Sequence, residues 1–187
     1  MKKTTVLIIA IILFSLNGIA QITKGNWMVG GSTSYTKSEY NQDNTPSIIT
    51  ITNSINLSPN VGYFFIDKLC IGTIYQYSSS ISKIESGKRT YKSNNIGPFI
   101  RYYILKPEKV TNIFLETSYN FSTVKDNKNT ILNSKLGVVY FLNSSIGFEL
   151  ALNYSINKYV YDSELISDST SKNLLLGLGF QIHLEKE

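Results

Sequence analysis

The feature that most constrains the fold is a strict alternation of residue types near the C-terminus. In NLLLGLGFQIHL (Asn173–Leu184) the even-numbered positions are all large and apolar, whereas the odd-numbered ones, Leu175 excepted, are glycine or polar. Successive side chains of a β-strand point to opposite sides, so a period of two predicts a strand with one apolar face and one small or polar face. The apolar face must lie against either a protein core or lipid.

Seven further segments repeat this alternation, and helical periodicity is hard to find. We therefore predict eight strands, at 26–36, 48–65, 69–78, 93–104, 110–123, 131–142, 145–157 and 173–184. The connections alternate between short ones (66–68, 105–109, 143–145) and long polar ones (37–47, 79–92, 124–130, 158–172). Short and long connections alternate in an antiparallel meander when all the short turns lie at one end. Small outer-membrane barrels have this arrangement, with short periplasmic turns and long outer loops.

The composition of the small or polar face indicates what the apolar face contacts: lipid, rather than a protein core. The small or polar face is rich in Gly and Ser and carries few ionised groups, namely Arg101, Glu116, Lys135 and Glu149. A soluble sandwich or lipocalin-like barrel points its apolar face inward and its polar face to water. Small residues instead suit the narrow interior of a closed eight-stranded wall. The expected fold is all-β: an eight-stranded antiparallel up-and-down transmembrane β-barrel.

The four charged residues predict an internal network. Their offsets from the short turns place them on neighbouring strands, on one face and at broadly similar heights. Because buried charges need partners, we predict ion pairs with alternating signs, in the order Arg101–Glu116–Lys135–Glu149. The alternative is four unrelated solvated charges.

The N-terminus indicates export. Lys2 and Lys3 precede the apolar run VLIIAIILFSL (Val6–Leu16), and small residues follow at Gly18 and Ala20, the pattern of a cleaved secretory signal peptide. The run is too short for a membrane anchor. We predict a signal peptide at 1–20 and a barrel domain at 21–187.

Nothing in the sequence predicts catalysis. The single histidine, His183, is expected on the inner face at the periplasmic end of the last strand, without a readable Ser–Asp–His arrangement. Cys70, the single cysteine, is expected to point inward and cannot form an intramolecular disulfide. Phosphate loops, dinucleotide motifs and clustered metal ligands are absent from the sequence, and the net charge of +5 includes no dense basic cluster for nucleic acid. We expect no enzyme activity, cofactor, metal or nucleic-acid partner.

Four segments carry a family resemblance that spans the mature chain. They resemble the small outer-membrane β-barrel domain family, the OmpA/OmpX-like eight-stranded barrels: GNWMVGGSTSYT (Gly25–Thr36), LSPNVGYFFIDKLCIGTIYQY (Leu57–Tyr77), IGPFIRYYI (Ile96–Ile104) and VVYFLNSSIGFELALNYS (Val138–Ser155). The resemblance implies a monomer in the outer membrane of a Gram-negative bacterium, with the barrel-assembly machinery as a partner during biogenesis. One departure is the tail EKE after Leu184, where such barrels often end on an aromatic residue.

The expected function is a non-enzymatic structural, envelope or surface-interaction role through four outer loops. One of these loops contains Lys83, Lys88, Arg89 and Lys92, which we predict as contacts for the phosphates of lipopolysaccharide; the alternative is a merely solvated loop. Two other functions stay open. A small pore or transporter would be obstructed by the inward-facing Phe99, Tyr103 and Phe114, and a soluble periplasmic carrier of apolar ligands would need a less polar interior.

Overall fold

The structure is a computed structural model that describes residues 22–42, 48–84, 87–123, 128–160 and 168–185. The predicted signal peptide lies outside the described residues. Within these ranges the chain forms eight β-strands: β1 (Trp27–Gln42), β2 (Ile48–Ile66), β3 (Leu69–Ile84), β4 (Gly87–Tyr103), β5 (Thr111–Ser122), β6 (Lys128–Phe141), β7 (Ile146–Val160) and β8 (Ser169–Leu184). Among the described residues, no helix is long and apolar enough to cross a membrane.

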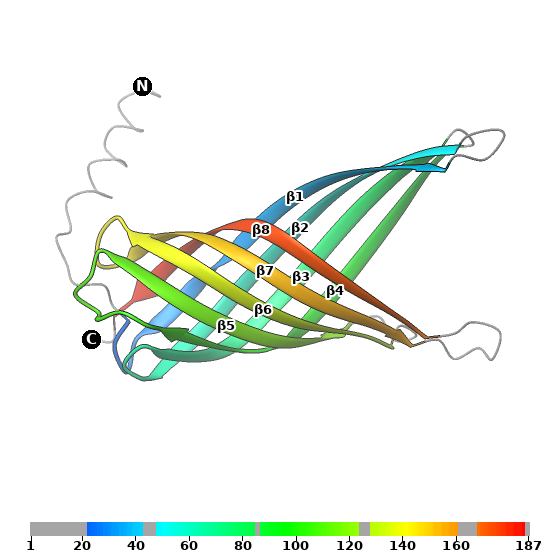
Figure 1. Cartoon of the computed structure of the whole chain (residues 1–187). Helices are drawn as coiled ribbons and strands as arrows, with labels where there is room; N and C mark the ends of the chain where they lie inside the picture. The colour runs from blue at the N-terminus through cyan, green and yellow to red at the C-terminus, as the bar shows by residue number, and fades with distance from the viewer. Residues whose placement is uncertain (1–21, 43–47, 85–86, 124–127, 161–167, 186–187) are drawn as a thin grey trace, which may run out of the picture.

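The strands form a closed antiparallel barrel (Figure 1). Each strand pairs with the next along the chain, and β8 closes the wall by pairing with β1. The predicted eight strands and their up-and-down order are therefore confirmed. The start of β1 and the end of β8 lie at the end of the barrel that carries the short turns (Figure 1), which we call the short-turn end. The opposite end is the long-loop end.

The wall divides toward the long-loop end. The pairing of β1 with β8 runs from Trp27–Leu184 only to Thr33–Leu178, and the pairing of β4 with β5 stops at Asn95–Ser122. Beyond these points β1 to β4 continue together and diverge from β6 to β8 (Figure 1). We call this extension, formed by residues 34–42, 48–58, 77–84 and 87–94, the projecting sheet.

The prediction of long polar loops was wrong for most of the segments 37–47 and 79–92, which are largely β-strand. Strands β3 and β4, for example, pair as far as Ile84 and Gly87, through most of the expected loop 79–92. These segments are rich in Ser, Thr and Tyr; Thr and Tyr favour strands, and hydroxyl pairs such as Ser54–Ser80 (2.8 Å) link neighbouring strands. Loss of the apolar alternation therefore marks where the strands leave the apolar belt, and not where they end.

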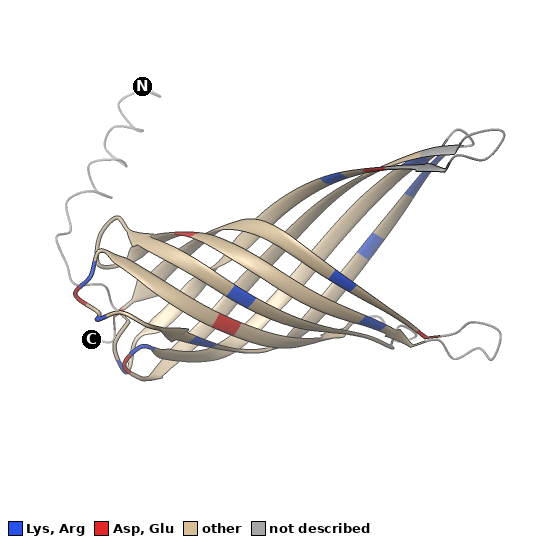
Figure 2. Ribbon diagram, viewed as in Figure 1, with Lys and Arg blue, Asp and Glu red and all other residues tan. Residues whose placement is uncertain are grey.

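The two faces of the wall are inverted relative to a soluble protein. Large apolar side chains cover the outside, and Leu174, Leu176 and Leu178 are each more than 60% exposed. Charged residues are sparse in the wall and more frequent at the turns and along the extended strands (Figure 2). The inside is narrow: a Cβ at Gly179 would lie 2.9 Å from a carboxylate oxygen of Glu149. A surface this apolar and this extensive is typical of contact with lipid.

Candidate functional site: the barrel interior

The barrel interior has two parts that differ in packing. The half toward the short-turn end is filled by side chains, which we call the plug. Its apolar members are all buried: Ile22, Met28, Phe64, Cys70, Ile74, Phe99, Tyr103, Phe114, Val139, Phe141 and Ala151. The half toward the long-loop end contains a polar cavity, which we call the vestibule.

Aromatic rings form much of the plug, and His183 packs among them. The imidazole of His183 stacks on Phe64 with ring centroids 5.7 Å apart and meets the ring of Phe141 at 5.5 Å. His183 is fully buried on the inner face near the end of β8, so it is a packed member of the plug. Among the described residues, no group of three or more His, Cys, Asp and Glu side chains could hold a metal ion.

The segment before β1 closes the short-turn end of the plug. Ile22 is fully buried, and its carbonyl oxygen accepts a hydrogen bond of 2.8 Å from the backbone N–H of Lys68. The N–H of Gly25 donates to the carbonyl oxygen of Phe64 at 2.9 Å. These bonds tie the segment to β2 and to the turn that follows it. No pattern in the sequence pointed to Ile22, because it lies outside the alternating segments.

The four charged residues singled out in the sequence lie together above the aromatic rings. Glu116 accepts from both cations, with its Oε2 2.6 Å from Nη2 of Arg101 and its Oε1 2.7 Å from Nζ of Lys135. Arg101 also pairs with Glu149 across the lumen. The order in space is therefore Glu149–Arg101–Glu116–Lys135, with alternating signs.

This order differs from the predicted one because of the strand register. Arg101 lies directly opposite Glu116, and Glu116 opposite Lys135, as expected for neighbouring strands. Opposite Lys135 on β7, however, is Asn153, and Glu149 lies four residues closer to the short-turn end, opposite Val139. The long side chain of Arg101 reaches Glu149 there.

The network is nearly sealed from water and neutral in sum. Side chains of Arg101 and Glu116 are 1% exposed, that of Glu149 3% and that of Lys135 8%. The guanidinium of Arg101 lies 4.3 Å from the ring centroid of Phe114, so it is held by a cation–π contact as well as by carboxylates. Two cations and two anions, each with an opposite partner, satisfy the condition for burying charge.

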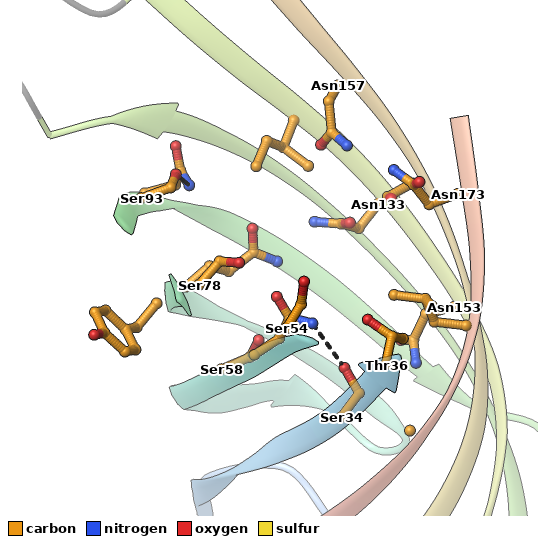
Figure 3. A pocket seen from close by; sticks show the side chains of 18 of the residues that line it. Ser34, Thr36, Ser54, Ser58, Ser78, Ser93, Asn133, Asn153, Asn157 and Asn173 are labelled. Atoms are coloured by element: carbon orange, nitrogen blue, oxygen red, sulfur yellow. Dashed lines mark hydrogen bonds between the residues drawn. The ribbon is translucent and has the colours of Figure 1, made fainter. Parts of the chain in front are cut away.

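The vestibule is a cavity of about 400 Å³ above this network. Side chains from β1 to β4 and from β6 to β8 point into it from all sides (Figure 3). The lining is dominated by Ser, Thr and Asn, including Ser34, Ser54, Ser78, Asn95, Asn129, Asn133 and Asn153. Sequence reasoning placed several of these residues on the inner face but did not predict a cavity. The clue was the run of inward Asn and Ser residues in the half of these strands nearer the long-loop end.

The predicted lipopolysaccharide-contacting residues lie on the projecting sheet and not in a loop. Lys83 of β3 pairs directly with Lys88 of β4, and Arg89 and Lys92 follow on β4. All four side chains are exposed. They lie beyond the point where β4 leaves β5, far along the barrel from the charge network.

Comparison with known proteins identifies the architecture. A scan against protein-family models and a search of curated proteins find no match. Among solved structures, the outer membrane protein OprG from Pseudomonas aeruginosa matches with a TM-score of 0.55 and 13% sequence identity, over 89% of this chain and 99% of that chain. The chain has the fold of an outer-membrane β-barrel. A structure described as a de novo designed transmembrane β-barrel also matches, with a TM-score of 0.44 and 10% identity over 87% of this chain and 98% of that chain.

Proposed function

We propose that the protein is a non-enzymatic integral barrel of the outer membrane, exported by its signal peptide, that acts in the envelope or at the cell surface through its projecting sheet. The inverted wall carries the proposal, because apolar side chains cover the outside of a closed barrel whose charges are paired inside. Separation of inner and outer membranes on a sucrose gradient tests the location. The protein should band with the outer membrane, and recovery in the soluble periplasmic fraction would contradict the proposal.

The projecting sheet is the part of the barrel that is available to partners. Strand β2 has 19 residues and β4 has 17, whereas a tilted strand needs only about 9–11 to cross the bilayer. The remainder of each strand extends beyond the apolar belt. Paired strands hold their side chains in a fixed array, which suits a surface for recognition better than separate loops do.

The basic residues of this sheet support a contact with lipopolysaccharide phosphates. Lys83 and Lys88 lie opposite each other, and Lys92 follows on the same face of β4 because side chains alternate along a strand. That face continues the one on which Ile96 is exposed next to the apolar belt. Arg89 has the opposite parity and points to the other face. This face therefore carries positive charge beyond the apolar belt, nearest to it at Lys92, where it can pair with lipid phosphates.

A matched pair of variants tests this contact. The triple variant K83A/K88A/K92A should lose the added heat stability that lipopolysaccharide gives to the barrel in vesicles, whereas R89A should keep it. Equal loss in both variants, or in neither, would exclude a contact through this face.

A pore function receives less support. The plug fills the short-turn half of the lumen with buried aromatic rings, among them Phe99, Tyr103 and Phe114, and eight strands leave little space beyond that. We expect no sugar flux in liposome-swelling assays, and sustained flux would reject the plugged barrel. A soluble carrier of apolar ligands would need an apolar cavity, and the vestibule is lined mainly by hydroxyl and amide groups.

A further inference from the structure

We propose that the vestibule is a binding site for a neutral polyhydroxylated ligand, a short carbohydrate. The proposal goes beyond the surface role above and is independent of it, because it stands on the geometry of the cavity. Three properties carry it: a closed floor, a lining without uncompensated charge, and buried amide oxygens that have no partner.

The vestibule has the size and form of a small-molecule site. Its volume of about 400 Å³ falls within the ~300–1,000 Å³ that such pockets occupy. The charge network and the plug form its floor, so a ligand would enter and leave at the long-loop end. A cavity that is closed at its floor suits binding of a ligand rather than its transport through the barrel.

The charge of the lining favours a neutral ligand. Lys135 is the one ionised side chain among the residues that line the vestibule, and its Nζ lies 2.7 Å from Glu116 Oε1. The network to which Lys135 belongs sums to zero. An anionic or cationic ligand would therefore find no compensating charge in the lining, which favours a neutral ligand.

The hydrogen-bonding groups of the lining favour a ligand rich in hydroxyls. Oδ1 of Asn95, Asn129 and Asn153 is buried without a hydrogen-bond partner in the part of the chain that the structure describes. Two of the matching amide nitrogens already donate, Asn95 to Ser93 Oγ at 2.9 Å and Asn153 to the carbonyl oxygen of Ala151 at 3.3 Å. What these side chains lack is a donor to their oxygens.

Sugar hydroxyls supply such donors and can also accept from the lining. Each hydroxyl carries one O–H donor and two lone pairs. Serines of the lining such as Ser54 and Ser78, on the other side of the view in Figure 3 from Asn133 and Asn153, can both donate and accept. A small turn of an Asn side chain about its last torsion, which is a soft one, would direct its oxygen into the chamber. Tyr159, on the inward face of β7, completes the lining and offers a ring face for the apolar C–H groups of a sugar.

Titration of the full barrel with defined sugars tests the proposal. The protein is folded in a detergent without a sugar headgroup, because glucoside and maltoside detergents would compete. Maltotriose and N,N′-diacetylchitobiose are the probes, and the readout is the NMR signals of the Asn side-chain amides. We expect saturable shifts that include Asn95, Asn129 and Asn153 for at least one probe.

Variants distinguish specific binding from a chamber that holds water alone. N129A/N153A should weaken binding about tenfold or more, since each lost acceptor removes a hydrogen bond, whereas N53A outside the vestibule should leave it unchanged. If the double variant does not fold, S78W, which fills the chamber, should abolish the shifts. No saturable shift with either probe, equal binding by N129A/N153A, or tighter binding of the charged probe galacturonate would overturn the proposal. None of these results would contradict the proposed surface function, which rests on other residues.

Discussion

Glu116 is the centre of the charge network, and its replacement by glutamine should destabilise the barrel. Both cations pair with this carboxylate: Arg101 at 2.6 Å and Lys135 at 2.7 Å. E116Q keeps the shape of the side chain and removes its charge, so the network changes from neutral to a net charge of +1. Lys135 then loses the anion to which it is bonded, whereas Arg101 keeps Glu149.

The magnitude follows from the burial of these groups. Removing one partner of a buried ion pair costs about 3–5 kcal/mol, because the other charge is left without compensation. Here the lower end applies, since Lys135 lines the vestibule and its side chain, at 8%, is more exposed than those of the other three network residues. We expect E116Q to lower the free energy of unfolding by about 3 kcal/mol.

Urea titration of the barrel in lipid vesicles measures this change, with the folded fraction read from unheated SDS gels. The control is E108Q, which removes a carboxylate from the exposed turn between β4 and β5 and should change stability by less than about 0.5 kcal/mol. The double variant E116Q/K135M removes both members of one pair and should be more stable than E116Q alone. The reasoning is refuted if E116Q matches E108Q, or if K135M adds its full cost to that of E116Q.

Three further substitutions test the plug and the wall. G137A brings a methyl group to 2.9 Å from Cβ of Ala151 and into the ring of Phe114. It should lower the free energy of unfolding by about 1–3 kcal/mol. Adding F114L should recover part of that loss in the same urea titration. I22D places an unpaired charge at a fully buried position and should lower the refolding yield into vesicles, while I22V should not. L136K, in the middle of the outer wall, should cost about 2–4 kcal/mol and I55K, toward the long-loop end, about 0–1 kcal/mol; equal costs would contradict a lipid-facing belt.

The strands and their faces could be predicted because the same alternation, with apolar residues outside and small or polar residues inside, holds along the whole wall. A barrel of this size has lipid outside and little room inside, so every strand must alternate, as Leu176 and Gly177 do. The same rule correctly placed Phe99, Tyr103 and Phe114 inside. Strand lengths could not be predicted from it, because the rule stops at the edge of the apolar belt while backbone pairing continues to Ile84 and Gly87.

The distance of a residue from a turn predicts its partner on the neighbouring strand, but not its contacts across the lumen, as the charge network shows. The distances from the short turns predicted similar heights for Arg101, Glu116 and Lys135, and these residues lie directly opposite one another on neighbouring strands. Glu149 lies only half as far from its turn as Lys135, and the hairpin register accordingly pairs Lys135 with Asn153. The contact between Arg101 and Glu149 joins strands that are not neighbours, so it depends on side-chain reach across the lumen. The vestibule likewise depends on the combined volume of many small residues.

The central claim, that the apolar face of the wall contacts lipid, is tested most directly by tryptophan fluorescence in vesicles of brominated lipid. The chain has a single tryptophan, so a W27F background allows one probe at a time. L178W, on the outside of the wall, should be strongly quenched by bromine on the acyl chains, whereas N133W, in the vestibule, should not. Quenching of N133W with L178W unaffected would contradict the account.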